Sequence, residues 1–148
     1  MKSIDNRFKS FVRCDSRIEI DLEKRKRATG FAGVAFLFRK TLNATPLVDE
    51  GNDRVIVLSV SMQDHSELFI IGVLLPSTNV NISDFSNTIE IVSGIYDRFS
   101  SDGVVIIVGD LNAQLSRAFG QKNHMKANDR GKLIEEFMSN RCLYSVNS

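Results

Sequence analysis

Apolar and polar residues alternate strictly in the first regular segment of the chain. Residues 17–22 place isoleucine and leucine on one face and charged side chains on the other, which predicts a strand with one solvated face. A basic run at 24–27 and Gly30 indicate a turn, and the apolar segment 31–38 predicts the returning, largely buried strand of a hairpin. The basic run is typical of a solvated turn; a nuclear-localisation or phosphate-binding patch is the alternative.

A second hairpin is predicted in the middle of the chain. Residues 54–60 and 68–75 are apolar runs of strand length, and the short polar segment 62–67 joins them. Residues 41–53 contain proline, glycine and asparagine and are expected to form the loop before this hairpin. His65 lies in the connection, where we expect a solvated loop histidine.

A helix and a buried strand come next. Apolar residues at spacings of three and four predict an amphipathic helix over 84–99, with Ser83 as its N-cap. Pro76 ends the preceding strand because proline cannot donate to a ladder. The β-branched run 104–108 then predicts a strand that is covered on both faces.

The last part of the chain predicts one more helix and one more strand. Residues 113–127 are polar and irregular, and Asn128 or Asp129 is a suitable cap for a helix with an apolar face. Residues 143–146 are expected to begin a final strand. The order β-β-β-β-α-β-α-β indicates an α/β (α+β) fold with a mixed, largely antiparallel sheet and helices covering one face of it.

Composition favours one globular domain over residues 1–148. Hydrophobic residues make up 43% and charged residues 25% of the chain, close to the globular average. The net charge of +1 produces no global attraction to nucleic acid or to an anionic membrane, so a nucleic-acid partner must be held by a local surface. Cys14 and Cys142 match no metal or redox spacing and are interpreted as reduced thiols.

The same composition bears on location. No apolar stretch reaches the ~18 residues of a membrane span, and the charged residues 1–17 lack the apolar stretch of a signal peptide. We therefore expect an intracellular protein of the nucleus or cytoplasm with no membrane partner.

The residues that are candidates for a catalytic or binding role follow the β-branched run, in the sequence VVIIVGDLN. Asp110 and Asn112 are two residues apart, so both side chains project to the same side if strand geometry persists. A carboxylate there orients water or binds a hard cation, and an amide donates to a phosphate oxygen. Gly109 allows a backbone or ligand to approach closely. A polar turn after a core strand is the alternative.

Four segments in order resemble the endonuclease/exonuclease/phosphatase superfamily. FAGVAFLFRK is similar to its G-G-V-A-I-x-x-R-K stretch, LFIIGVLLPSTN to its strand ending in Tyr-x-Pro, and VVIIVGDLN to its G-D-[FL]-N strand. RGKLIEEFMSNRCLYSVN matches the helix and strand that follow. The nearest branch by this resemblance is the apurinic-like endonuclease domain of non-LTR retrotransposons.

The resemblance implies a four-layer α-β-β-α sandwich and Mg²⁺-assisted hydrolysis of phosphodiester bonds, with DNA or another phosphodiester as substrate. In that scheme Asp110 orients or deprotonates the attacking water. Asn112 binds the scissile phosphate and helps Asp110 hold the metal. Ser77, Asn79 and Arg130 are the further expected phosphate or nucleic-acid contacts.

The sequence departs from the family pattern at several places. The opening strands that carry an asparagine and a metal-binding glutamate have no counterpart, and Glu19 is not suited to replace the glutamate. Leu74 stands where the family has a tyrosine that donates to phosphate. No second aspartate or Ser-Asp-His motif follows, and His124 is in the wrong order to serve. These departures predict a single incomplete domain that is impaired or inactive alone.

Two alternatives to a truncated endonuclease remain open. One is a nucleic-acid-binding pseudo-enzyme or retrotransposon remnant, and the other is a scaffold that keeps only the fold. An incomplete sandwich also exposes sheet edges, which predicts a complementing chain or self-association. The basic residues expected to form a nucleic-acid footprint are Arg39, Lys40, Arg117, Lys122, Lys126 and Arg130.

Overall fold

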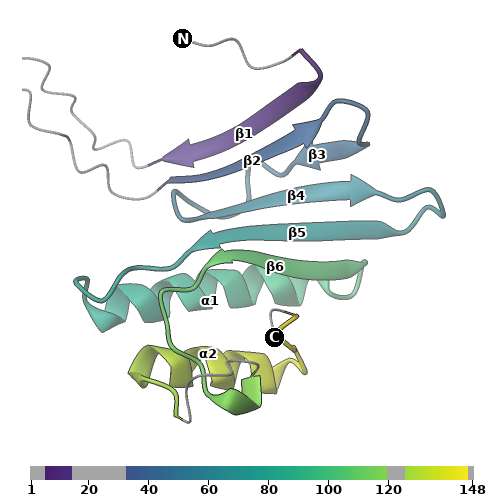
Figure 1. The fold of residues 1–148 in the computed structure, drawn as a ribbon. Helices are drawn as coiled ribbons and strands as arrows, with labels where there is room; N and C mark the ends of the chain where they lie inside the picture. The colour runs from purple at the N-terminus through teal and green to yellow at the C-terminus, as the bar shows by residue number, and fades with distance from the viewer. Residues whose placement is uncertain (1–5, 15–32, 120–125, 147–148) are drawn as a thin grey trace, which may run out of the picture.

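The computed structural model describes residues 6–14, 33–119 and 126–146 of the 148-residue chain. Its elements are shown in Figure 1 and run in the order β1 (Phe8–Cys14), β2 (Gly33–Arg39), β3 (Ala44–Pro46), β4 (Val55–Ser61), β5 (Glu67–Leu74), α1 (Ile82–Phe99), β6 (Val104–Asp110), η1 (Arg117–Phe119) and α2 (Asp129–Asn140). The predicted strand at 17–22 and the basic run at 24–27 lie outside the described residues.

The larger sheet has four strands in the order β3-β4-β5-β6. Strands β3, β4 and β5 are antiparallel neighbours, with Val57 opposite Ile71 in the register of β4 and β5. Helix α1 then carries the chain back over the sheet, so β6 pairs parallel to β5 with Ile107 beside Ile71. The predicted mixed, largely antiparallel sheet is confirmed.

Both helices begin at an asparagine that caps free backbone N–H groups. The side-chain oxygen of Asn81 accepts from the Ser83 N–H at 3.1 Å, so the cap of α1 lies two residues before the predicted Ser83. Asn128 caps α2 as expected, through a 2.7 Å bond from the Gly131 N–H. Each helix buries one apolar face; the buried residues there include Phe85, Val92, Ile95, Ile134 and Met138.

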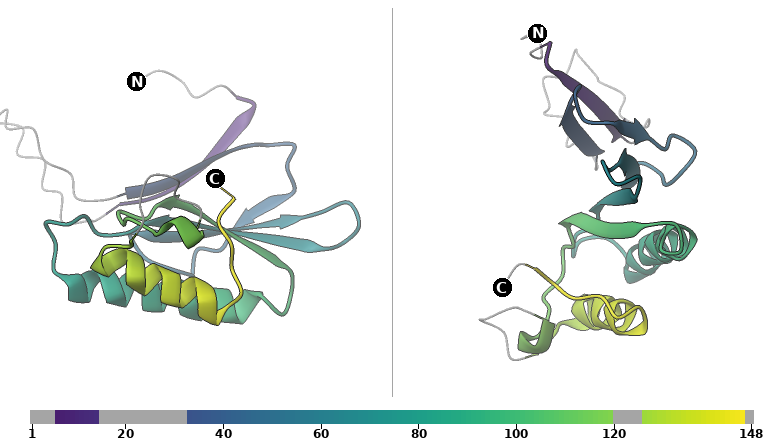
Figure 2. Two further views of the ribbon diagram at one scale, coloured as in Figure 1. Left: turned by 60° about the horizontal axis from the view of Figure 1, so that its bottom comes forward. Right: turned by 90° about the vertical axis from the view of Figure 1, so that its right-hand side faces the viewer.

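The two faces of the larger sheet pack against different partners. Val57, Ile71 and Val73 on one face join the buried residues of α1 and α2 in the main core. On the other face, β2 crosses β4 and β5 and inserts its phenylalanines among residues such as Leu58. The approach at Phe36 is close enough that a Cβ added to Gly72 would lie 2.8 Å from its ring. Figure 2 shows the helices together on one side of the sheet and β1 and β2 on the other.

The described residues thus form helix, sheet and hairpin layers, which are three layers of the expected sandwich and confirm the α/β (α+β) class. Strand β1 pairs antiparallel with β2, as Phe11 opposite Phe36 shows. The pattern analysis missed β1 because Lys9, Ser10 and Arg13 interrupt its apolar run. It also assigned the short β3 to a loop, since Pro46 ends it.

The predicted strand at 143–146 is wrong. These residues form no strand, and the Leu143 N–H instead bonds to the Met138 carbonyl at the end of α2. Tyr144 and Val146 are more than three-quarters exposed, at 82% and 80%. The apolar residues in this segment therefore have no neighbouring strand to pair with among the described residues.

The prediction that both faces of β6 are covered is also wrong. Val104, Ile106 and Val108 share one face of this strand and are 62%, 43% and 40% exposed. Strand β2 packs over β4 and β5, and β6 lies at the edge of the sheet beyond them. An apolar strip on an open sheet edge therefore leads toward Asp110. No helix among the described residues is long and apolar enough to cross a membrane.

Paired substitutions in adjacent strands test this asymmetry. Ile71 is fully buried, so Ile71→Ala is expected to lower the free energy of unfolding by about 2–5 kcal/mol. Ile106→Ala removes the same atoms from a partly exposed site and is expected to cost less than about 1 kcal/mol. Urea unfolding followed by circular dichroism measures both. Equal losses that grow with protein concentration would show instead that another copy covers the strip.

Candidate functional site

The ends of β5 and β6 form one rim of the sheet. Leu74 pairs with Asp110 in the parallel register, and the Leu75 N–H continues the ladder to the Asp110 carbonyl at 2.9 Å. Because the strands are parallel, the loops that leave them begin side by side. The residues after β5 and after β6 therefore meet at this rim.

Gly109 makes the close pairing of these two strands possible. Its φ is +142°, a conformation that side chains with a Cβ rarely adopt. A Cβ at this position would overlap the Val73 carbonyl oxygen of β5. The glycine is thus required by the approach of β5, and it changes the direction of β6 just before Asp110.

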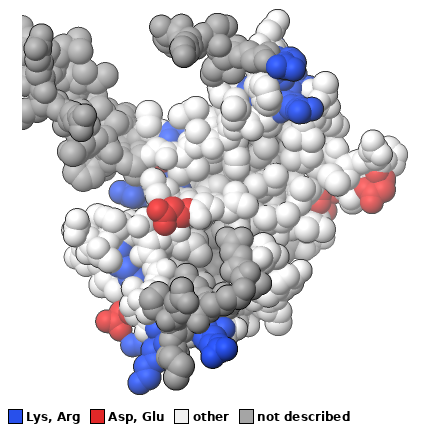
Figure 3. Space-filling view, viewed as in Figure 1, with Lys and Arg blue, Asp and Glu red and all other residues white. Residues whose placement is uncertain are grey.

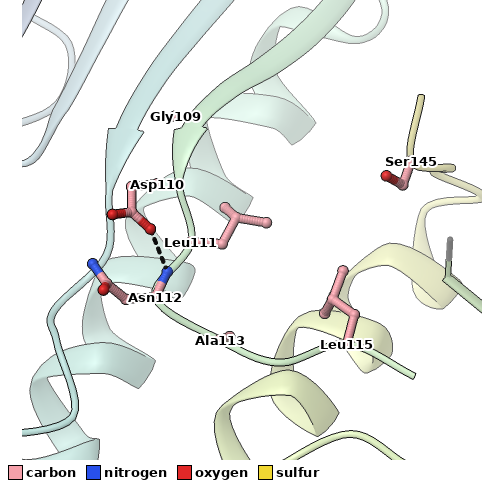
Figure 4. A pocket seen from close by; sticks show the side chains of 7 residues that line it. All are labelled: Gly109, Asp110, Leu111, Asn112, Ala113, Leu115 and Ser145. Carbon is pink, nitrogen blue, oxygen red and sulfur yellow. Dashed lines mark hydrogen bonds between the residues drawn. The ribbon is translucent and has the colours of Figure 1, made fainter. Parts of the chain in front are cut away.

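Asp110 and Asn112 lie on the same side of the β6 end, as Figure 4 shows. The Asn112 N–H donates to Asp110 Oδ1 at 2.9 Å, and Asn112 Nδ2 donates to the Leu75 carbonyl at 2.8 Å. Asn112 has a φ of +44°, so the strand geometry assumed from the sequence does not persist. A turn closed by hydrogen bonds, and not the strand period, brings the two side chains together.

Each of these side chains has one oxygen atom without a hydrogen-bond partner among the described residues. Asp110 is exposed, and its Oδ2 has no hydrogen-bond partner among the described residues. Asn112 is half-buried, and its amide nitrogen holds Leu75 while its Oδ1 forms no bond within that part of the chain. The rim therefore presents one carboxylate oxygen and one amide oxygen to solvent.

A hollow of about 440 Å³ borders the same strand end. Leu111, Leu115 and Ser145 lie on the side of the strand opposite the Asp110 and Asn112 side chains (Figure 4). The lining of the hollow mixes apolar and polar residues and includes Asp110 and Asn112, whose side chains extend on the other side of the strand from Leu111. The site with candidate chemistry is the exposed rim.

Ser77 and Asn79 lie in the loop that leaves β5. Both are exposed, and the Val80 N–H closes a turn to the Ser77 carbonyl at 3.0 Å. This loop begins directly after Leu75, the residue held by Asn112. The structure therefore places Ser77 and Asn79 on the rim loop beside the polar pair, outside the hollow.

Arg130 is buried, whereas the phosphate or nucleic-acid contact expected of it requires an exposed side chain. The side chain is 6% exposed and donates to the Pro76 and Val80 carbonyls, the second at 2.6 Å. Its guanidinium carbon lies 4.9 Å from the centre of the Phe85 ring. A buried guanidinium that is used in this way fixes the loop of Ser77 and Asn79 and is not presented to a phosphate.

The first turns of α2 also hold the loop that leaves β6. The Asn128 side-chain oxygen accepts from the Gln114 N–H at 3.3 Å as well as from Gly131. Gly131 approaches so closely that a Cβ there would overlap the Gln114 carbonyl oxygen. Both rim loops are therefore attached to the start of one helix.

Four of the remaining expected cations belong to the described part of the chain. Arg39 is the last residue of β2 and Lys40 follows it, and β2 ends on the side of the molecule where β6 begins (Figure 1). Arg117 and Lys126 are exposed between β6 and α2. Figure 3 shows the Lys and Arg side chains of the described residues at several separate places on the visible face, with Asp and Glu side chains among them.

Three further candidates, Glu19, Lys122 and His124, lie outside the described residues. His65 is exposed in the β4–β5 turn, at the opposite end of the sheet, in keeping with a loop histidine. In the part of the chain that is described, no group of three or more His, Cys, Asp or Glu side chains could hold a metal ion.

Pattern analysis missed one residue of this rim, Arg54. Its carbonyl accepts from the Leu74 N–H at 2.9 Å, which extends the row Leu74–Asp110 by one strand. In the sequence Arg54 only begins an apolar run, and no local signal marks it. The register of β4 and β5 is what brings it to the site.

No protein-family model matches the chain, and no curated protein matches it. A solved structure described as the endonuclease domain of TRAS1, a telomere-specific non-LTR retrotransposon, is similar, with a TM-score of 0.68 and 13% sequence identity. The match covers 95% of this chain and 55% of that one, so the chain spans about half the length of the matched structure. The expected resemblance is thereby confirmed at the level of the fold.

Gly109→Ala is expected to lower the free energy of unfolding by about 2–4 kcal/mol, because the new Cβ meets the Val73 carbonyl in a strained conformation. Gly94→Ala is the matched control: it lies in α1 with no atom near its added Cβ, and it should stabilise by roughly 0.5–1 kcal/mol. Chemical denaturation measures both. A neutral Gly109→Ala would contradict the close strand approach.

Arg130→Met is expected to lower the free energy of unfolding by about 2–4 kcal/mol, because it leaves two carbonyls without their donor. Amide hydrogen exchange should also accelerate at Val80, which closes the turn of that loop. Unchanged stability and exchange, with weakened binding to DNA, would restore the phosphate-contact role for Arg130.

Proposed function

We propose that the rim formed by Asp110 and Asn112 binds Mg²⁺ together with a phosphodiester of DNA, and that the chain is part of an endonuclease-type domain. The observation that carries the proposal is the pair of unbonded side-chain oxygens held on one side of the β6 end. The shared fold with a retrotransposon endonuclease domain supports this reading, and the substrate and cofactor are our inference.

The residues present fit a weakly held magnesium ion. Mg²⁺ prefers oxygen ligands and is usually bound by one or two carboxylates with substrate phosphates and waters completing its shell. Asp110 Oδ2 supplies the carboxylate oxygen and Asn112 Oδ1 an amide oxygen. With a single carboxylate, affinity depends on the phosphate of the substrate, so cation and substrate are expected to bind together.

The two residues divide the chemistry between them. Asp110 orients the attacking water and accepts its proton, since its carboxylate reaches solvent. Asn112 Nδ2 has a second hydrogen besides the one given to Leu75, and it donates this to a phosphate oxygen. The cation, when bound, supplies Lewis-acid stabilisation of charge that develops on the phosphate.

Cleavage by these 148 residues alone is proposed to be slow or absent. No second acidic side chain joins Asp110 in a metal cluster within the described residues. Leu74, which neighbours Asp110 in the register, has no group that donates to phosphate. Loss of one general acid or base costs roughly 10²–10⁴-fold in rate. Binding without turnover, as in a pseudo-enzyme, is the second candidate.

The cation site is tested by titrating the ¹⁵N-labelled chain with Mn²⁺ as a paramagnetic probe. We expect the backbone amide signals of residues 109–112 to broaden first. Asp110→Asn should abolish this broadening, and Asp102→Asn should leave it intact because Asp102 is exposed at the other end of β6. Broadening that ignores Asp110→Asn would overturn the proposed site.

Turnover is measured separately, as nicking of supercoiled plasmid with Mg²⁺. We expect no nicking above that of the Asp110→Ala variant. Rapid nicking that the variant loses would contradict the proposed inactivity and confirm the site.

A further inference from the structure

Arg54 lies in a row of three residues across the rim. The Leu74 N–H donates to the Arg54 carbonyl at 2.9 Å, one step beyond the Val55–Val73 pair, and Leu74 pairs with Asp110 on its other side. Neighbouring strands are about 4.8 Å apart, so Arg54 and Asp110 flank Leu74 with roughly 10 Å between their Cα atoms. That span suits a phosphate held from both sides.

Arg54 directly precedes β4, and continuing the alternation of that strand gives it a position on the sheet face opposite the helices. Val55 and Val73 face the main core on α1 and α2, so the residues beside them belong to the opposite face. The exposed strip of Val104, Ile106 and Val108 leads to Asp110 on that same face. Arg54 and Asp110 are therefore reached from the same side of the sheet.

The backbone that carries Arg54 is rigidly held. Asn52 Oδ1 accepts from the Arg54 N–H at 2.9 Å and from the Val55 N–H at 3.0 Å. Gly51, with a φ of +78°, packs so closely that a Cβ would overlap the Val55 carbonyl oxygen. A turn fixed in this way presents the arginine from a constant position.

The guanidinium of Arg54 is free although the residue is half-buried. It forms no hydrogen bond or ion pair with the described part of the chain. A partly desolvated, unpaired cation is unfavourable and is relieved by an anion. Four other arginines are engaged: Arg13 with the Val48 and Glu50 carbonyls, Arg98 with the Glu50 carboxylate, Arg130 with Pro76 and Val80, and Arg141 with Asp97.

We infer that Arg54 is a phosphate-binding residue of this rim, which takes the non-bridging oxygens of a phosphodiester whose cation is held at Asp110. The inference rests on the proposed function. A guanidinium presents parallel donors that match phosphate oxygens. Leu74, between the two residues, donates nothing, and Arg54 supplies the missing donors from the next strand.

The direct test uses inorganic phosphate, without divalent cation, on the ¹⁵N-labelled chain. We expect saturable shifts of the Arg54 Nε–Hε signal and of the Leu74 and Asp110 amides. Arg54→Met should abolish them while it keeps the apolar stem in place, and Arg54→Lys should weaken them. Lys9→Met is the control, because Lys9 is an exposed cation of β1 opposite Phe38, and should change nothing.

Binding to a duplex DNA oligonucleotide gives a second measurement. Arg54→Met is expected to raise the Kd about 5- to 20-fold and to reduce the slope of log K against log salt by about one, as for one lost phosphate contact. Lys9→Met, which removes an exposed cation of β1, should leave both values unchanged.

The outcomes separate this inference from the proposed function. Phosphate shifts that survive Arg54→Met, or that appear equally at Arg39 and Arg117, overturn the assignment of Arg54 whatever the manganese result. Saturable phosphate binding at Arg54, together with manganese broadening that ignores Asp110→Asn, removes the cation site and leaves the arginine assignment standing.

Discussion

The close parallel pairing of β5 with β6 is the constraint on which the rest of the rim depends. It is possible because Gly109 has no Cβ to meet the Val73 carbonyl. Beyond this contact the chain turns, and Asn112 completes the turn by donating from its backbone to Asp110 and from its side chain to Leu75. The same contacts that end the strand therefore position the carboxylate of Asp110 and the amide of Asn112.

Helix α2 extends that order to both loops of the rim. Its cap residue Asn128 accepts from the Gln114 N–H, after β6. Arg130, in its first turn, donates to the Pro76 and Val80 carbonyls, after β5. Buried groups hold the loops, and Ser77 and Asn79 remain exposed. The buried guanidinium of Arg130 has a structural role, whereas the guanidinium of Arg54 has no hydrogen-bond partner among the described residues.

The uncovered strip on β6 gives this surface its second property. The β1–β2 hairpin shields β4 and β5 but leaves Val104, Ile106 and Val108 open at the sheet edge. An apolar edge of this kind favours association with further β-structure. The strip ends at Asp110. A polypeptide that packed on Val104, Ile106 and Val108 would therefore also lie next to Asp110 and Asn112.

Much of this protein follows from local sequence. Period and length place β4, β5, α1, β6 and α2, because burial of apolar faces imposes their repeats. The polar residues of GDLN follow the apolar run and mark the end of β6. Tertiary structure decided the rest. Lys9 and Arg13 interrupt the apolar pattern of β1, which forms a strand because it pairs with β2. The exposure of one face of β6 depends on which strands the β1–β2 hairpin covers. The roles of Arg130 and Arg54 depend on helix docking and strand register, contacts between residues distant in the chain that no local spacing encodes.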